Sequence, residues 1–272
     1  MGNGPAPNAR ARYWRPVMQY LGVNKVNSYS QGCYLGVLGG MGPMAGAAFA
    51  LRLAALTPAD ADQQHIPTLL RNDPRIPDRS SAYMAGGENP LPYMVEGVRF
   101  LERAGAQLIA IPCNTAHLWY DDIAAATQRP VLHIIQAVID DLRRLGLQQG
   151  RIGLMGTAAT LKLGLYQRHL EAQGYECIVP DDDEVERYCM ASIRAVKGNQ
   201  LEAAFAPAAD CIARLKARGA DAVVLGCTEL PLAVPHALRP SLGITLTDSI
   251  DALARAAIAH YLADQPEQRI AA

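Results

Sequence analysis

The chain has 272 residues, of which 50% are hydrophobic and 19% are charged, and its formal net charge is −1. This length suffices for one large domain or for two lobes with real cores. The near-neutral net charge does not indicate binding to nucleic acid or to an anionic membrane, so we expect a small-molecule partner. Gly, Pro or charged residues interrupt every apolar run before the ~20 residues that a bilayer span needs, which predicts a soluble protein.

Cysteine usage indicates a reducing compartment, and we expect a cytoplasmic protein. The chain has no CxxC pair and no secretory apolar region, so a disulfide framework is not predicted. The six cysteines are Cys33, Cys113, Cys177, Cys189, Cys211 and Cys227.

Residues 1–32 differ in composition from the rest. They carry Arg10, Arg12, Arg15 and Lys25 but no acidic residue, and they show no sustained periodicity. We predict a flexible N-terminal tail. A targeting segment is the alternative interpretation, but no cleavage site is evident.

The first half then alternates apolar strands with amphipathic helices. We predict, in chain order, a strand at 34–38, a helix to about 56, a strand at 66–70, a helix at 90–104, a strand at 107–111, a helix at 116–126, and a strand at 131–135 that runs into a helix to 145.

The second half repeats this alternation. We predict a strand at 151–155, a helix at 161–173, a strand at 176–179, helices at 184–197 and 201–218, strands at 221–225 and 244–246, and a helix at 249–262. Such spacing predicts an α/β fold with parallel sheets that helices cover on both faces. Ligands of such sheets bind beyond the carboxyl ends of the strands.

One stretch of the chain occurs twice. Residues 101–115 are similar in sequence to residues 215–229, and Cys113 follows Gly105 by as many positions as Cys227 follows Gly219. Each copy predicts the end of a helix, a turn, a buried strand and then a cysteine. If the two halves face each other, two thiols flank one ligand, which suits removing a proton from one face of a carbon and returning it to the other.

Four motifs occur in order between about residues 34 and 265, and they carry a family resemblance. They are Gly39-Gly40-Met41-Gly42-Pro43, Ile76-Pro77-Asp78-Arg79, Pro112-Cys113-Asn114-Thr115-Ala116-His117 and Gly226-Cys227-Thr228-Glu229-Leu230-Pro231. Together they resemble the aspartate racemase branch of the aspartate/glutamate racemase superfamily. Glutamate racemases are less similar, because their second cysteine motif has His where this chain has Glu229.

The resemblance implies a fold and an activity. The fold is two pseudo-symmetric α/β lobes, residues 33–131 with 244–272 and residues 132–243, with the active site in the cleft between them. The implied activity is interconversion of the L and D forms of an acidic amino acid, aspartate or glutamate, without a cofactor. Relatives also suggest a homodimer.

The chemistry of inversion explains the two thiols. A thiol has a pKa of ~8.5 that helix N-termini or cations can tune toward neutrality, so Cys113 and Cys227 can exchange the roles of base and acid. We expect Asn114, Thr115 and Thr228 to be helix N-caps and to contact the α-carboxylate or the ammonium group. The alternative is that both cysteines are buried structural thiols.

A second carboxylate on the substrate needs cationic partners. The resemblance assigns Arg79 to the distal carboxylate and matches Lys197 to the family's lysine, while Met41 and Gly42 lie against the substrate backbone. The alternatives are an ion pair of Arg79 with Asp73 or Asp78, and a solvated charge at the end of a helix for Lys197.

Other functions stay open from the sequence. One is a decarboxylase or cis/trans isomerase of the same superfamily, and another is a non-catalytic amino-acid-binding or redox module. No metal site is predicted, because the spacing of Cys113, His117 and Cys227 matches no compact zinc pattern; His117 is interpreted as a packing residue or a neighbour of the thiol. The GxGxxA turn at 40–45 does not predict nucleotide binding, because Pro43 removes a backbone donor.

Overall fold

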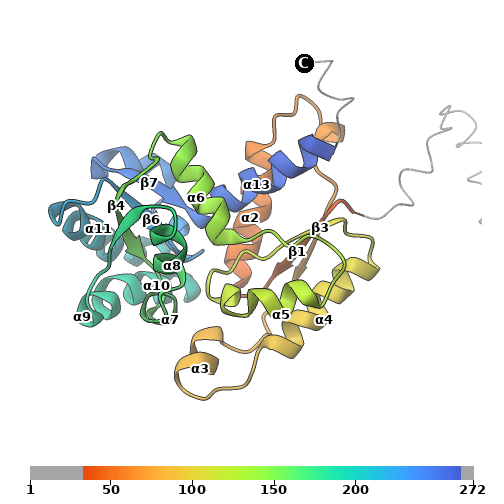
Figure 1. The fold of residues 1–272 in the computed structure, drawn as a ribbon, viewed down its shortest axis with the longest axis horizontal. Helices are drawn as coiled ribbons and strands as arrows, with labels where there is room; N and C mark the ends of the chain where they lie inside the picture. Colours follow the sequence, from red (N-terminus) through yellow and green to blue (C-terminus); the bar gives the residue numbers. More distant parts are fainter. Residues whose placement is uncertain (1–32, 265–272) are drawn as a thin grey trace, which may run out of the picture. The chain divides into compact units, whose positions relative to one another are not determined.

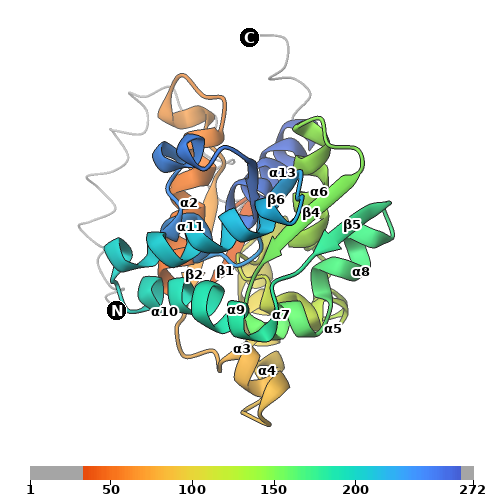
Figure 2. The same cartoon turned by 90° about the vertical axis from the view of Figure 1, so that its left-hand side faces the viewer.

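The computed structural model describes residues 33–264, so the predicted tail lies outside the described residues. Two parallel sheets flanked by helices confirm the α/β prediction (Figures 1 and 2). Their strand orders are β2-β1-β3 and β5-β4-β6-β7. None of the described helices is long and apolar enough to cross a membrane.

The first sheet is built around β1, whose five residues are all buried and which pairs in parallel with β2 and β3. The elements of this half are β1 (Leu35–Gly39), α2 (Pro43–Leu56), η2 (Asp62–Gln64), β2 (Thr68–Asn72), α3 (Arg79–Met84), α4 (Leu91–Arg103), β3 (Leu108–Ala110), η3 (Thr115–Trp119), α5 (Tyr120–Ala125) and α6 (Ile134–Arg144).

The second sheet has β4 and β6 at its centre, and Figure 2 shows β5 beside β4. Its elements are β4 (Gly150–Met155), α7 (Ala158–Lys162), α8 (Leu165–Glu171), β5 (Tyr175–Ile178), α9 (Asp182–Glu184), η4 (Val185–Met190), α10 (Ala191–Lys197), α11 (Leu201–Ala217), β6 (Ala222–Leu225), α12 (Leu230–Ala233), η5 (His236–Leu242), β7 (Thr245–Asp248) and α13 (Ser249–Asp264).

Four predicted elements differ from the structure in more than their bounds. The helix expected at 116–126 begins as the 3-10 helix η3, and the helix expected at 184–197 contains the π-helix η4. The strand expected at 131–135 is only a single bridge from Val131 to Ile109, because α6 already begins at Ile134. The helix expected at 161–173 is broken into α7 and α8 by Gly164, whose φ of 63° is left-handed. Glycine adopts this conformation without steric cost, so it ends one helix and starts the next.

The C-terminal segment, expected in the first lobe, contacts both halves. Its strand β7 pairs with β6 in the four-stranded sheet, while α13 packs against α2 and α6 (Figure 1). The hydrophobic pattern of so short a strand does not say which sheet it joins. The division into lobes at 131 and 244 stays a prediction.

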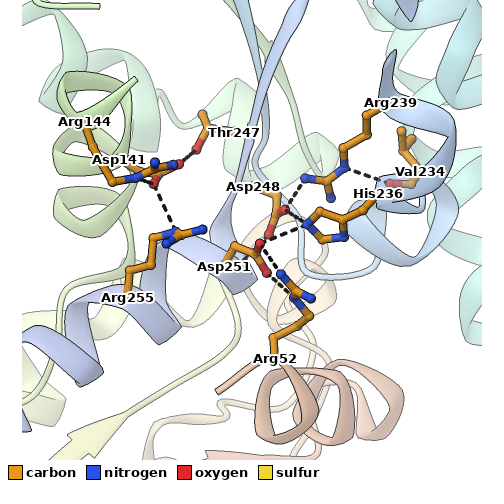
Figure 3. Close-up of polar contacts among 10 residues, drawn as sticks. All are labelled: Arg52, Asp141, Arg144, Val234, His236, Arg239, Thr247, Asp248, Asp251 and Arg255. Atoms are coloured by element: carbon orange, nitrogen blue, oxygen red, sulfur yellow. Dashed lines mark hydrogen bonds and ion pairs between the residues drawn. The ribbon is translucent and has the colours of Figure 1, made fainter. Parts of the chain in front are cut away.

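Ionic contacts hold the start of α13 to its neighbours (Figure 3). Asp251 accepts hydrogen bonds from Arg52 of α2 at 2.6 and 2.8 Å, and His236 of η5 lies 2.9 Å from the same carboxylate. Arg239 Nη1 lies 2.7 Å from Oδ2 of Asp248, which is fully buried. Helices from both halves of the sequence therefore meet at one charged cluster.

Candidate active site

The strand ends of both sheets carry the motif loops. Gly39 ends β1 directly before the Gly40–Gly42 turn, and Cys113 follows β3. In the second sheet Thr157 follows β4 and Cys227 follows β6. These are carboxyl ends of parallel strands, where α/β folds bind ligands.

The turn after β1 depends on glycine at its first position. Gly40 has a φ of 94°, and a Cβ there would lie 2.1 Å from the backbone oxygen of Asp73. No side chain fits so close to backbone, so this loop and the loop after β2 approach each other only with glycine. Gly42 then precedes Pro43, the first residue of α2.

Both motif cysteines line one small cavity of about 20 Å³. Cys113 and Cys227 come from the two copies of the repeated sequence, and each is 5% exposed. Eight of the nine predicted site residues line this inner cavity: Met41, Arg79, Cys113, Asn114, Thr115, Lys197, Cys227 and Thr228. The structure adds Asp78, Ser80, Thr157 and Glu229, which the sequence did not single out as site residues.

A larger outer cavity of about 320 Å³ adjoins the inner one. Gly42, the ninth predicted residue, lines it together with apolar side chains such as Met44, Ile76 and Val196. The residues common to both cavities are Asp78, Arg79, Lys197 and Glu229. Four ionisable side chains therefore stand where the outer cavity meets the thiols.

Arg79 is a buried cation that has no acidic partner among residues 33–264. It is 7% exposed, and its Nη1 donates to the backbone oxygens of Ile76 and Pro77 at 3.1 and 2.7 Å. Its Nε has no hydrogen-bond partner, and within residues 33–264 no carboxylate forms a salt bridge with it. The alternative of an ion pair is therefore wrong: Asp73 pairs with Arg75 at 2.7 Å, and Asp78 caps α3. A buried guanidinium left unpaired favours an anionic ligand.

Lys197 ends α10 and is exposed, as expected for a charge at the end of a helix. It also lines both cavities, and among the described residues it forms no salt bridge. Its positive charge lowers the pKa of Cys227. A second cation thus faces the same space as Arg79.

The predicted helix caps do not form. Neither η3 nor α12 has a side-chain cap. Asn114 instead donates to Ser249 Oγ at 2.8 Å and accepts from the Tyr166 hydroxyl at 2.6 Å. Thr115 Oγ1 lies 3.1 Å from the hydroxyl oxygen of Thr157. Long-range partners outcompete the local cap and fix these side chains at the cavity wall.

His117 contacts the backbone around Cys113 and not its sulfur. Its Nδ1 lies 2.9 Å from the Cys113 carbonyl oxygen, and its Nε2 accepts from the Ile134 N–H at 3.1 Å. Nδ1 is thereby the protonated nitrogen. Burial lowers the pKa of His117 to about 4, so the ring is neutral near pH 7. The imidazole therefore braces the Cys113 loop against α6.

Cys227 differs from an ordinary thiol in its surroundings. Burial raises its pKa well above the usual range, and the nearby charge and hydrogen bond of Glu229 raise it further. The Glu229 backbone N–H and Lys197 act in the opposite direction. All six cysteines are free, so no disulfide links Cys113 to Cys227.

Comparisons with known proteins identify the family of the chain. The model of the Asp/Glu/Hydantoin racemase family matches residues 38–257. The chain belongs to this family. It is a family of cofactor-independent amino-acid racemases.

Solved structures of racemases share the fold. The aspartate racemase of Picrophilus torridus is 33% identical, with a TM-score of 0.74 over 84% of this chain and 94% of that one. An aspartate racemase homologue from Pyrococcus horikoshii is 26% identical, with a TM-score of 0.66 over 83% and 97%. The broad specificity amino-acid racemase RacX of Bacillus subtilis is 28% identical over 63% of this chain and 72% of its own length.

Proposed function

We propose that this family member racemises an acidic amino acid, aspartate or glutamate, by a two-base mechanism that uses Cys113 and Cys227. One observation carries the proposal: thiols from the two copies of a repeated motif line one cavity, beside a buried guanidinium to which no described carboxylate is paired. The likeness to the Picrophilus torridus aspartate racemase supports the same substrate class.

Charge complementarity orients the substrate in this proposal. The distal carboxylate binds Arg79 and Lys197 at the junction of the two cavities. The α-carboxylate lies deeper, near Asn114, Thr115 and Thr228. This places the α-carbon in the inner cavity, where both sulfurs are.

Proton transfer then inverts the α-carbon. One cysteine, as thiolate, takes the α-proton, while the other, as thiol, delivers its proton to the opposite face. Hydrogen bonds to the α-carboxylate stabilise the charge that it gains as the C–H bond breaks. Met41 and Gly42 limit the space around the substrate backbone. The two sulfurs exchange roles for the other enantiomer, and no cofactor takes part.

Single replacements of the thiols test the proposal. We expect Cys113→Ser and Cys227→Ser each to lower the rate of inversion by at least about a hundredfold, because a hydroxyl is a far weaker acid than a thiol. The assay is separation of L- and D-aspartate and L- and D-glutamate on a chiral column. Cys177→Ser, away from the cavities, is the matched control. Full activity in either motif variant contradicts the two-base mechanism.

The assembly and location are part of the same proposal. We propose a cytoplasmic homodimer, as the resemblance to racemases implies. Light scattering of the purified protein measures the mass directly. A mass of two chains supports the dimer, and a mass of one chain at micromolar concentration contradicts it.

A further inference from the structure

Glu229 is a buried carboxylate that bonds to a catalytic candidate. It is 3% exposed, and its Oε2 accepts hydrogen bonds from Cys227 Sγ at 3.0 Å and from Thr228 Oγ1 at 3.4 Å. Among residues 33–264 it has no cation within salt-bridge distance. Burying a carboxylate with no cation beside it lowers the stability of the fold. A contribution to stability therefore does not explain why Glu229 lies here.

Both halves of the fold position this carboxylate. The backbone oxygen of Glu229 accepts a hydrogen bond from the Ala233 N–H at 3.1 Å, which holds Glu229 at the start of α12. A Cβ placed on Gly42 would lie only 3.2 Å from Glu229 Oε1. Because Gly42 has no side chain, the Glu229 carboxylate has room at this position, where it lines both the inner and the outer cavity.

We propose that Glu229 is a positioning residue that keeps Cys227 as the protonated thiol of the resting enzyme. The inference rests on the proposed racemase function and deepens it. The first substrate proton then passes to Cys113: the Cα–H bond breaks as the Cys113 S–H bond forms. The Cys227 S–H bond breaks as its proton adds to the opposite face of the carbon. The resting state returns when Cys113 loses a proton to solvent and the Cys227 thiolate gains one.

Electrostatics explains the asymmetry. Burial raises the pKa of Cys227 first, and the negative charge of Glu229 and the hydrogen bond to it add to this rise. The carboxylate of Glu229 repels the negative charge of the Cys227 thiolate and so disfavours it relative to the thiol. The thiolate is therefore a strong base once it forms. Lys197 opposes this effect. The other ionisable side chains that line the inner cavity are Asp78, Arg79 and Cys113, and the Tyr166 hydroxyl donates a hydrogen bond to Asn114 of the cavity lining.

Alkylation measures the state of each thiol without requiring activity. Iodoacetamide is added between pH 6 and 10, and peptide mass spectrometry follows Cys227 and Cys113 separately. In the wild type we expect the midpoint for Cys227 above the ~8.5 of a free thiol. In Glu229→Gln the amide still accepts a hydrogen bond but carries no charge. We expect the Cys227 midpoint to fall by about one pH unit, with a rate at pH 7.5 about tenfold higher, and Cys113 to change less than twofold.

A matched control and a second variant keep the test decisive. Glu202→Gln removes an exposed carboxylate at the start of α11 and should leave both midpoints unchanged. Glu229→Asp keeps the charge but retracts it, so its midpoint should lie between wild type and Glu229→Gln. If the variants fail to fold by circular dichroism, the wild-type midpoint decides: a value at or below that of a free thiol overturns the proposal. An unchanged midpoint in folded Glu229→Gln also overturns it.

The racemase assay separates this inference from the function. The alkaline limb of kcat/KM reports loss of the donor proton, so Glu229→Gln should move that limb to lower pH by about one unit. The shift must be equal in both directions, because racemisation has an equilibrium constant of one. An alkylation shift without any racemisation by the wild type contradicts the proposed function alone. Racemisation without either shift contradicts the role of Glu229 alone.

Discussion

At the scale of single residues, the site depends on charges that the fold leaves unpaired. The Arg79 Nη1 donates to two backbone oxygens, while its Nε has no hydrogen-bond partner in the described part of the chain, although the side chain is buried. Its neighbour Arg75 behaves in the opposite way, since it is exposed and pairs with Asp73. Arg75, in the loop after β2, and Arg79, the first residue of α3, are therefore suited to different roles.

Replacing Arg79 tests whether it binds the distal carboxylate. We expect Arg79→Met to raise KM for aspartate and glutamate by at least about tenfold, because a charge-assisted hydrogen bond of roughly 1.5–3 kcal/mol is lost. The measurement is steady-state racemisation kinetics. Arg75→Met, outside both cavities, should leave KM unchanged. An unchanged KM in Arg79→Met removes Arg79 from substrate binding.

The residue types of the site were predictable where a motif repeats or resembles a family. Cys113 and Cys227 follow from the duplication, because each stands at the same distance from a Gly-Ala turn. Glu229 was visible in its motif, but its bond to the Cys227 sulfur was not, because the bend that brings the two together is a property of the folded turn. Asp78 and Ser80 likewise reach the cavity only because the loop after β2 folds toward Gly40.

At the scale of elements, the sequence predicts the alternation of strands and helices but not the irregular segments that interrupt or connect them. Apolar runs of four to six residues predicted both sheets, because central parallel strands are buried on both faces. The single left-handed residue Gly164 divides a helix whose hydrophobic pattern is continuous. The short segment at 131–133 satisfies the strand pattern but makes one bridge only. Such segments depend on backbone angles that the pattern does not encode.

The helix at 182–197 depends on a buried acidic residue. Asp181 and Glu184 form a capping box, in which each side chain accepts a hydrogen bond from the backbone N–H of the other. The Glu184 carboxylate also binds Arg218, which directly follows α11. The hydrogen bond from Arg218 lowers the pKa of Glu184 below its usual 4.5. A lowered pKa in the folded state contributes stability above pH 4.5, and this contribution is lost as the pH falls through the folded value.

We therefore expect Glu184→Gln to lower the free energy of unfolding by about 1 kcal/mol at pH 7. The difference from wild type should shrink as the pH falls below about 4.5. Urea unfolding followed by circular dichroism at several pH values measures it. Asp183→Asn breaks an exposed i,i+4 pair with Arg187 and is the matched control. A difference that stays constant with pH contradicts the assigned linkage.

At the scale of the whole molecule, the charged cluster of Figure 3 connects helices from both ends of the chain. Asp248 ends β7 fully buried, and burial raises its pKa, an effect that the adjacent Arg239 opposes. Asp251, on the first turn of α13, binds Arg52 of α2. The cluster thus holds the second sheet, α13 and α2 in one arrangement.

We expect Arg239→Met to destabilise the protein by about 3 kcal/mol, because it leaves the Asp248 charge buried without its partner. Thermal unfolding measures the loss. The double replacement Arg239→Met with Asp248→Asn should recover part of the stability, since position 248 then carries no buried charge that lacks its partner. Arg194→Met, which breaks an exposed ion pair with Glu186, is the control and should change stability by less than about 1 kcal/mol. Equal stability of Arg239→Met and wild type contradicts the structural role of the cluster.

The central claim is that two opposed thiols exchange a proton with one α-carbon, and incubation in deuterated water tests it most directly. L-aspartate and L-glutamate are incubated with the protein, and α-deuterium incorporation is followed by NMR together with optical rotation. We predict that the D enantiomer forms and carries deuterium at the α-carbon, because the proton comes from a solvent-exchanged thiol. Formation of a different product, or neither exchange nor inversion with either amino acid, contradicts the account.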